Sequence, residues 1–133
     1  MPILTHWETE PDTPCALVHL HFEGTWTADD LFQTLIGIND IAQEDALNVT
    51  AVYHLVGQVR IPSGLMDMTR RIITHGIAGI CAFYIITESR LWRSLGNLIL
   101  RLYSHRIPWE THFISSVADA PSIKERCEVS ASS

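Results

Sequence analysis

The feature that most constrains the fold is the segment 49–66, in which a largely apolar run leads into a turn and then into a helix. Apart from Tyr53 and His54, residues 49–56 have the pattern of a central strand that is covered on both faces. The strand pattern ends at Gly57, and a helix is expected after the Pro-Ser-Gly turn that follows. Ligands of open α/β sheets bind where strands end and the next helix begins, so this segment also predicts the region of a site.

Hydrophobic periodicity predicts the other elements. In residues 14–22, Val18 and Leu20 fall on one strand face and His19 and His21 on the other, which suits a sheet with one buried and one partly exposed face. The order β-β-α-β-α-β-α-β-α predicts an α/β fold with a mixed, mostly parallel sheet and right-handed crossovers. The remaining strands are expected at 2–9, 80–87 and 111–115, and the helices at 27–46, 63–75, 89–104 and 117–127.

Length and composition indicate a single domain. The chain has 133 residues, 47% hydrophobic and 18% charged, which suffices for one core over residues 1–127, and the tail 128–133 is expected to be disordered. The N-terminus lacks the basic and apolar regions of a signal peptide. The longest apolar run, Ile77 to Ile86, is about half the length that a membrane-spanning helix needs. These features predict a cytoplasmic protein.

The cysteines give no sign of a disulfide framework. Cys15, Cys81 and Cys127 share no short spacing, and their number is odd. Cys81 lies inside an apolar run and is expected to be a small core residue. A reducing compartment agrees with both observations.

Charge is distributed unevenly along the chain. Residues 1–59 contain nine acidic residues and no Lys or Arg, whereas residues 60–133 contain all nine basic residues and only six acids. This distribution predicts an acidic side and a basic side of the molecule. The net charge of −6 argues against nucleic acid as the main partner.

Two stretches, together with the element order, resemble those of a known family. They are Phe22-Glu-Gly-Thr-Trp-Thr-Ala-Asp-Asp-Leu, which leads into the first helix, and residues 55–65, which lead into the second. Residues 1–120 thereby resemble the STAS family (sulfate transporter and anti-sigma-factor antagonist), in particular its small SpoIIAA-like and Sec14-like stand-alone members. In that family an Asp-Ser-Ser-Gly-Leu turn carries the serine that accepts phosphate from a partner kinase. Here the turn is Ile-Pro-Ser-Gly-Leu, so the resemblance implies that Ser63 occupies the phosphoacceptor position.

Ser63 and Gly64 form a candidate phosphoacceptor or anion-binding turn, because free N–H groups at a helix N-terminus point toward such a ligand. The alternative is an ordinary N-cap, for which serine is among the preferred residues. A hydrolase nucleophile is disfavoured, since no Gly-x-Ser-x-Gly motif surrounds Ser63 and no acid–histidine pair is evident. The sequence also shows no nucleotide-binding loop and no paired-carboxylate motif, and we predict a protein without enzymatic activity.

The seven histidines are scattered along the chain. His19 and His21 share a strand face and would need a third ligand, His6 or Glu23, to bind a metal. Two histidines on a partly exposed face need no metal, so we predict neither a metal site nor a cofactor. His54 is expected to be a buried imidazole that is hydrogen-bonded.

The predicted third helix is unusually apolar and basic. Leucines at helical spacing form a stripe that aromatic side chains and an isoleucine widen, and arginines carry the charge without a neighbouring acid. An apolar arc this wide exceeds what one sheet face needs, so the surplus predicts a dimer interface, a groove for an apolar ligand or a surface for acidic lipids. A core helix with arginines extending around its edge is the remaining alternative. The residues of this candidate surface are Arg90, Leu91, Trp92, Leu95, Leu98, Ile99, Leu102 and Tyr103.

These observations lead to two hypotheses of function. The first is a non-enzymatic STAS-like protein-interaction or regulatory module, homodimeric, that acts through the Ser63 turn and the third helix. The second is a carrier of a small apolar ligand or lipid, with a pocket between the third helix and the sheet. The tryptophans fit either hypothesis, because Trp7, Trp26, Trp92 and Trp109 can anchor a core or line a pocket.

Overall fold

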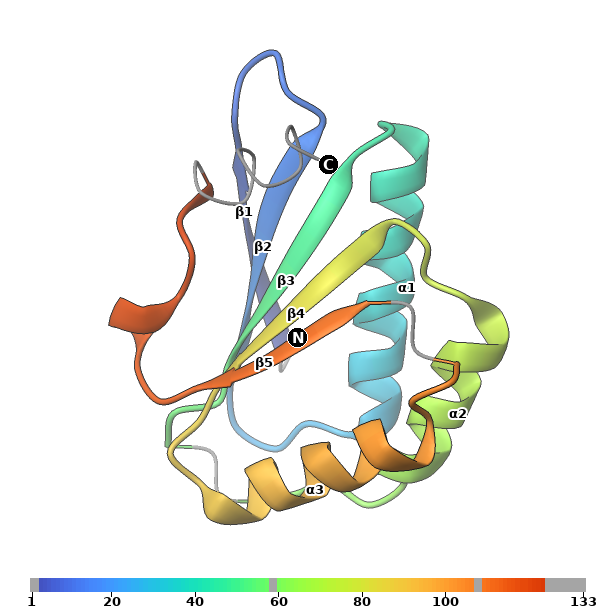
Figure 1. Ribbon diagram of the computed structural model, residues 1–133, viewed down its shortest axis with the longest axis vertical. Helices are drawn as coiled ribbons and strands as arrows, with labels where there is room; N and C mark the ends of the chain where they lie inside the picture. The colour runs from blue at the N-terminus through green and yellow to red at the C-terminus, as the bar shows by residue number, and fades with distance from the viewer. Residues whose placement is uncertain (1–2, 58–59, 107–108, 124–133) are drawn as a thin grey trace.

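The computed structural model describes residues 3–57, 60–106 and 109–123. One five-stranded sheet has the spatial order β1-β2-β3-β4-β5, with β1 antiparallel to β2 and every later neighbour parallel (Figure 1). The predicted α/β class with a mixed, mostly parallel sheet is confirmed. The elements are β1 (Ile3–Thr9), β2 (Cys15–Phe22), α1 (Ala28–Glu44), β3 (Asn48–His54), α2 (Leu65–His75), β4 (Ile80–Ile86), α3 (Arg90–Leu102), β5 (Glu110–Ile114) and a 3-10 turn at Val117–Asp119.

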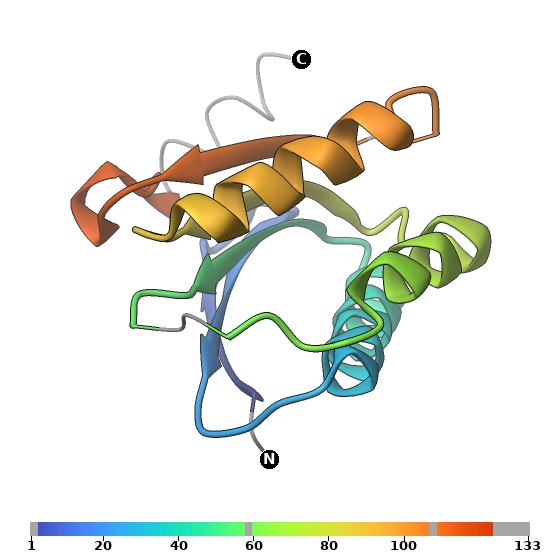
Figure 2. The same ribbon diagram turned by 90° about the horizontal axis from the view of Figure 1, so that it is seen from below.

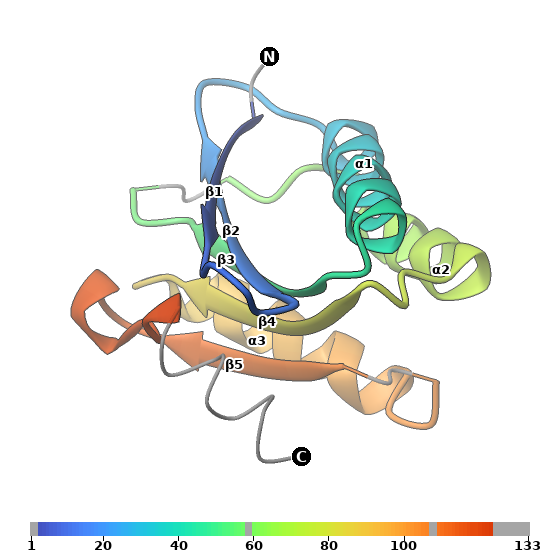
Figure 3. The ribbon, with the colours of Figure 1, turned by 90° about the horizontal axis from the view of Figure 1, so that it is seen from above.

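The sequential strand order determines where the helices lie. Each βαβ connection adds its new strand on the same side of the previous one, and right-handed connections of this kind place their helices on one face of the sheet. Figures 2 and 3 show α1 and α2 on the inner side of the curved sheet, and Figure 1 shows α3 below the strands. Because the order never reverses, the sheet has no topological switch point, which is where ligands bind in doubly wound folds.

The first two helices begin in different ways. Thr27 caps α1: its Oγ1 accepts from the Asp30 N–H at 3.0 Å, and the Asp30 carboxylate accepts from the Thr27 N–H at 2.9 Å. The prediction that Ser63 caps α2 is wrong, since the N-cap is Gly64 and no side chain caps this helix. Gly64 has a φ of 82°, a left-handed conformation that glycine adopts without strain. Ser63 therefore stays in the turn before the helix.

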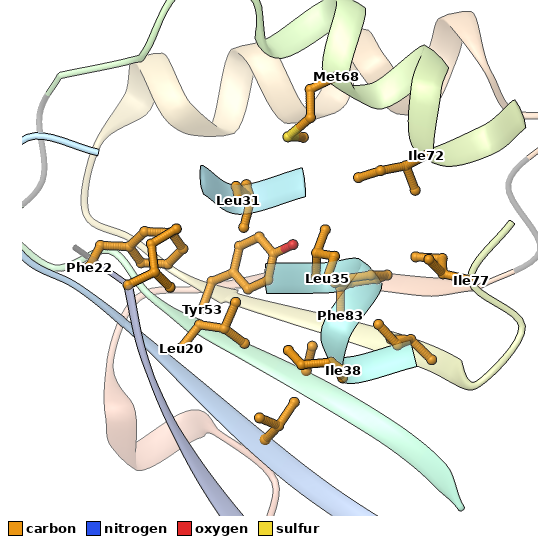
Figure 4. Close-up of a cluster of buried hydrophobic side chains, with 14 of the residues drawn as sticks. Leu20, Phe22, Leu31, Leu35, Ile38, Tyr53, Met68, Ile72, Ile77 and Phe83 are labelled. Atoms are coloured by element: carbon orange, nitrogen blue, oxygen red, sulfur yellow. The ribbon is translucent and has the colours of Figure 1, made fainter. Parts of the chain in front are cut away.

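The two faces of the sheet bury different sets of side chains. On the helix-covered face, Leu20 and its same-face neighbours join the main core, part of which Figure 4 shows. On the opposite face, Leu17, Val52 and Ile86 form a smaller cluster, against which Ile123 packs from the segment after β5. The alternation predicted for β2 is confirmed.

The cysteines differ from their predicted environments. Cys81 is exposed rather than in the core, because it lies at a register shift between β3 and β4 where the strand alternation is interrupted. Its thiol donates to the Val49 carbonyl oxygen at 3.3 Å. Cys15 is buried and disulfide-bonded.

The C-terminal segment also differs from its prediction. The 3-10 turn at Val117–Asp119 replaces the start of the helix expected over 117–127, and Pro121 disfavours a helix through this region. The later part of that prediction, like the expected disorder of the tail 128–133, lies outside the described residues. None of the described helices is long and apolar enough to cross a membrane.

Charges from the two halves of the sequence meet between α1 and α2. The Arg71 guanidinium of α2 lies 3.5 Å from the Asp29 carboxylate of α1 and 4.1 Å from the centroid of the Phe32 ring. The acidic first half and the basic second half are therefore not separated along this helix pair.

Candidate functional site

The helices and the sheet border an apolar pocket of about 130 Å³ that opens to solvent, which we call the helix–sheet cavity. Its residues come from α1, α2 and α3, from the core face of β2 to β5, and from the connections between them. No Lys, Arg, Asp, Glu or His occurs in this lining. The lining residues are Phe22, Trp26, Leu31, Leu35, Tyr53, Leu55, Leu65, Met68, Thr69, Ile72, Phe83, Ile85, Trp92, Leu95, Gly96, Ile99, Leu100, Trp109, Thr111 and Phe113.

A glycine sets the inner side of α3. A Cβ at Gly96 would lie 2.6 Å from Cε1 of Phe113 on β5, so the helix approaches this ring more closely than a residue with a side chain would allow. Trp92 is the buried residue of α3, and together with Leu95 and Ile99 it lines the cavity. The inward side of the helix is therefore centred on these residues rather than on the leucine stripe.

The outer side of α3 is apolar as well. Leu91, Leu98 and Leu102 have exposed fractions of 61%, 45% and 60%. Arg90 and Arg101 are exposed beside them and make no ion pair with any described residue. The candidate surface predicted from the sequence is thus divided between the cavity and the solvent.

Contacts near both ends hold α3 in place. At its start, the Ser89 Oγ accepts a hydrogen bond from the Trp92 N–H at 3.3 Å, and Arg93 donates to the Ser115 Oγ at 2.6 Å. At its end, Tyr103 borders an open recess that it shares with three residues of α2, Met66, Asp67 and Arg70.

Aromatic side chains from separate elements meet in the lining. The rings of Trp26 and Trp92 stack with centroids 5.9 Å apart and an interplanar angle of 16°. Trp26 also contacts Phe22 at 4.6 Å between centroids. The connection before α1 and the start of α3 are therefore joined by stacked indoles, so these tryptophans both anchor the core and line the cavity.

Three hydroxyl groups lie in this lining. The Thr69 Oγ1 donates to the Leu65 carbonyl oxygen at 2.9 Å. The Thr111 Oγ1 is buried and has no hydrogen-bond partner in the described part of the chain. The Tyr53 hydroxyl likewise has no hydrogen-bond partner among the described residues. Burial raises the pKa of the Tyr53 phenol well above its ordinary value, so this group is neutral.

The predicted Ser63 turn lies next to the lining. Ser63 and Gly64 are exposed, whereas Leu65, the first residue of α2, reaches the cavity. The segment 49–66, from which the sequence predicted a site, also contributes Tyr53 and Leu55 to the lining.

A second group of functional side chains occupies the opposite face of the sheet, where His6, His19, His21 and His54 form what we call the histidine face. Strand register pairs His6 with His19 and His21 with His54. The His19 Nδ1 lies 2.9 Å from the His54 Nε2, and the His19 Nε2 lies 3.1 Å from a Glu8 carboxylate oxygen. The rings of His21 and His54 stack at 4.3 Å between centroids. A hydrogen-bonded chain Glu8–His19–His54 results.

The Glu8 carboxylate at the end of this hydrogen-bonded chain determines which ring nitrogens carry a proton. An ionised Glu8 can only accept, so the His19 Nε2 donates to it, and the Nδ1 of a neutral His19 then accepts from the His54 Nε2–H. Burial, together with the neighbouring His21 and His19, lowers the pKa of His54 to about 4. Burial and the neighbouring His19 and His6 also lower the pKa of His21. His54 is therefore a neutral, hydrogen-bonded imidazole as predicted, although it is half-buried rather than buried.

Metal coordination was one interpretation of these histidines. Within the described residues, no group of three or more His, Cys, Asp and Glu side chains is arranged to hold a metal ion. His6, which the sequence offered as a third ligand, has its ring centroid 6.1 Å from that of His19.

Comparison of the chain with protein-family models, with curated proteins and with solved structures gives no match in any of the three. The resemblance to the STAS family therefore rests on the element order and on the sheet, whose antiparallel first pair and parallel remainder are consistent with that topology.

Two residues of these sites were missed in the sequence. Gly96 is a glycine inside a helical pattern, which is a signal of close packing that could have located the inner side of α3. Glu8 gave no signal, because its contact with His19 depends on the register between β1 and β2.

Proposed function

We propose that this protein is a non-enzymatic binding protein for a small apolar molecule, with the helix–sheet cavity as its binding site. The observation that carries the proposal is a pocket of about 130 Å³ that apolar side chains line without a charged residue. Apolar cavities of roughly 150 Å³ accept a molecule the size of benzene.

The energetics of an unfilled cavity support the same proposal. Protein interiors are close-packed and leave few voids larger than a water molecule. A ligand that fills the space restores the missing dispersion contacts, which gives it a reason to bind.

Filling the cavity from α3 tests this proposal. Benzene added to the protein is expected to shift the NMR methyl signals of Ile72 and Ile99 saturably, since both residues line the cavity. Ile99→Phe places a ring in the same space and is expected to weaken benzene binding at least tenfold. Leu98→Phe is the matched control, because Leu98 is next to Ile99 in the sequence but is 45% exposed on the outer side of the helix.

The outcomes separate clearly when circular dichroism shows both variants folded. Weaker binding in Ile99→Phe alone supports the cavity as the site. Equal binding in the two variants contradicts it, and absence of saturable binding in the unmodified protein overturns the proposed function.

A second candidate function, a homodimeric STAS-like interaction module, is supported by the exposed Leu91, Leu98 and Leu102 of α3. An apolar stripe of this kind on a helix surface suits contact with a second copy or another protein. Sedimentation analysis tests it: Leu102→Glu should dissociate a dimer, whereas Ile41→Glu on α1, where the side chain is 43% exposed, should not. A monomeric unmodified protein contradicts the homodimer.

Regulation at the exposed Ser63 belongs to this second candidate. If Ser63 accepts phosphate, the intact mass of protein from its native cell carries a phosphate increment that Ser63→Ala abolishes. An unmodified mass under conditions in which the partner kinase is active argues against that role.

A further inference from the structure

Tyr53 is the feature of the helix–sheet cavity that packing alone does not explain. Its ring projects from β3 into the apolar cluster with the hydroxyl oxygen at its inner end (Figure 4). The ring packs edge-to-face against Phe22 and Phe83, at 5.6 Å and 5.7 Å between centroids. The side chain lines the cavity, and the residue is 9% exposed.

The hydroxyl adds nothing to the packing of the described residues. No described residue makes a hydrogen bond with it, and the apolar side chains around it offer few partners. Three other ring positions in the lining are phenylalanine: Phe22, Phe83 and Phe113. A phenylalanine at position 53 would keep the same ring contacts without the unpaired group, so the hydroxyl is better explained by a partner that comes with a ligand.

The other two hydroxyls of the lining do not offer the same group. The Thr69 hydroxyl already donates to the Leu65 carbonyl oxygen. The Thr111 oxygen is closed off from accessible space, whereas the Tyr53 hydroxyl is not among the buried unpartnered atoms and its residue is 9% exposed. Tyr53 is therefore the hydroxyl that a bound molecule would reach.

The charge of the ligand follows from the rest of the lining. No basic or acidic side chain lines the cavity, so a buried carboxylate or ammonium group would have no counter-ion. The Tyr53 hydroxyl is neutral and both donates and accepts hydrogen bonds.

We infer that the ligand is a small uncharged molecule with an apolar body and one hydrogen-bonding group, such as a phenol or a short alcohol, and that Tyr53 recognises this group. The inference rests on the proposed function, because it names the ligand class of the same cavity. The apolar body of this ligand is about the size of a single aromatic ring.

Phenol and benzene form the matched pair of probes, because they differ by the hydroxyl alone. Both are titrated, by NMR, into the unmodified protein, Tyr53→Phe and Thr111→Val. Tyr53→Phe is expected to weaken phenol binding three- to tenfold relative to benzene binding, the range that loss of one neutral hydrogen bond produces. Thr111→Val also removes a lining hydroxyl, but one that a ligand does not reach, and should leave the phenol-to-benzene ratio unchanged.

Each outcome decides one of the two proposals. Selective loss of phenol binding in Tyr53→Phe supports the inference. Binding of both probes with the same ratio in every protein overturns the role of Tyr53 and leaves the cavity as a site for hydrocarbons. Failure of both probes to bind the unmodified protein overturns the proposed function and the inference with it.

Discussion

The two faces of the sheet use alternate residues of the same strands for opposite purposes. The helix-covered face borders an apolar cavity that contains no charged side chain. The histidine face carries four imidazoles and Glu8, joined by hydrogen bonds and ring stacking. Sequential strand order produces this difference, because it places the helices on one side and leaves the other to a short C-terminal segment.

Tyr53 and His54 show how far this difference reaches. They are neighbours in the sequence but point to opposite faces of β3, as strand residues do. Burial raises the pKa of the Tyr53 phenol and lowers that of the His54 imidazole. The cause is the same in both, since desolvation disfavours whichever form is charged. One covered strand therefore holds an uncharged donor on each face.

The largest expected effect is on the covered face, where Gly96→Val should break the packing of α3. A Cβ at this position would overlap the ring of Phe113, so α3 must move away from β5. We expect a loss of about 3 kcal/mol in the free energy of unfolding, at the upper end for overpacking. Urea denaturation measures it.

Gly37→Ala is the control for this variant. Gly37 lies in α1, and a Cβ there would meet nothing within 4 Å. This substitution should stabilise the protein by about 0.5–1 kcal/mol, because alanine favours a helix over glycine. Equal destabilisation by the two variants would show that α3 does not depend on close approach to Phe113.

The next effect is the pH dependence that the histidine face produces. His54 faces His19 and His21, with Glu8, His6 and Glu23 nearby in the cluster, and its pKa falls from 6.5 to about 4 on folding. Between these values the unfolded state binds more protons, so stability decreases as pH falls from 6.5 toward 4. We expect a contribution of about 1–2 kcal/mol, reduced from the full shift because the ring is partly solvated.

Unfolding curves at pH 7 and pH 4.5 measure this contribution by comparison of variants. His54→Gln should reduce the loss of stability between the two pH values, whereas His105→Gln, at an exposed position after α3, should leave it unchanged. If His54→Gln loses as much stability on acidification as the unmodified protein, His54 is not the source.

The smallest expected effect concerns the Thr111 hydroxyl, a polar group on the otherwise apolar helix-covered face. Thr111→Val removes a buried hydroxyl that has no partner among the described residues and keeps the shape of the side chain. We expect an increase of about 1 kcal/mol in the free energy of unfolding, since the desolvation cost of that group disappears. Thermal denaturation measures the change, and a variant that melts at a lower temperature than the unmodified protein would contradict the expected stabilisation.

The fold was predictable from the sequence because its signals are local. The alternation of Val18 and Leu20 with His19 and His21 identified the two faces of β2, and the capping residues Thr27 and Asp30 fixed the start of α1. Strand and helix limits predicted from periodicity agree with the structure to within two residues at most ends.

The candidate sites were less predictable because they depend on tertiary geometry. The sequence identified a wide apolar arc on α3 but did not orient it. In the structure Trp92 and Ile99 line the cavity beside Gly96, whereas Leu91 and Leu102 are exposed. Amphipathicity cannot distinguish two apolar sides of one helix. The N-cap of α2 was also mispredicted. Position 64 has the left-handed backbone conformation that glycine adopts without strain, and this requirement is not visible in the sequence pattern.

The strand order also has a consequence for biosynthesis. A ribosome delivers β1 to β4 with α1 and α2 before it releases α3 and β5, and each of these strands pairs with the one made before it. Tyr53 and its neighbours on the sheet therefore assemble while the wall formed by Gly96 and Phe113 is still missing. Small molecules in the cell have access to the nascent site before it closes. Protein made in cells can thus hold a molecule that the same chain, refolded in clean buffer, lacks.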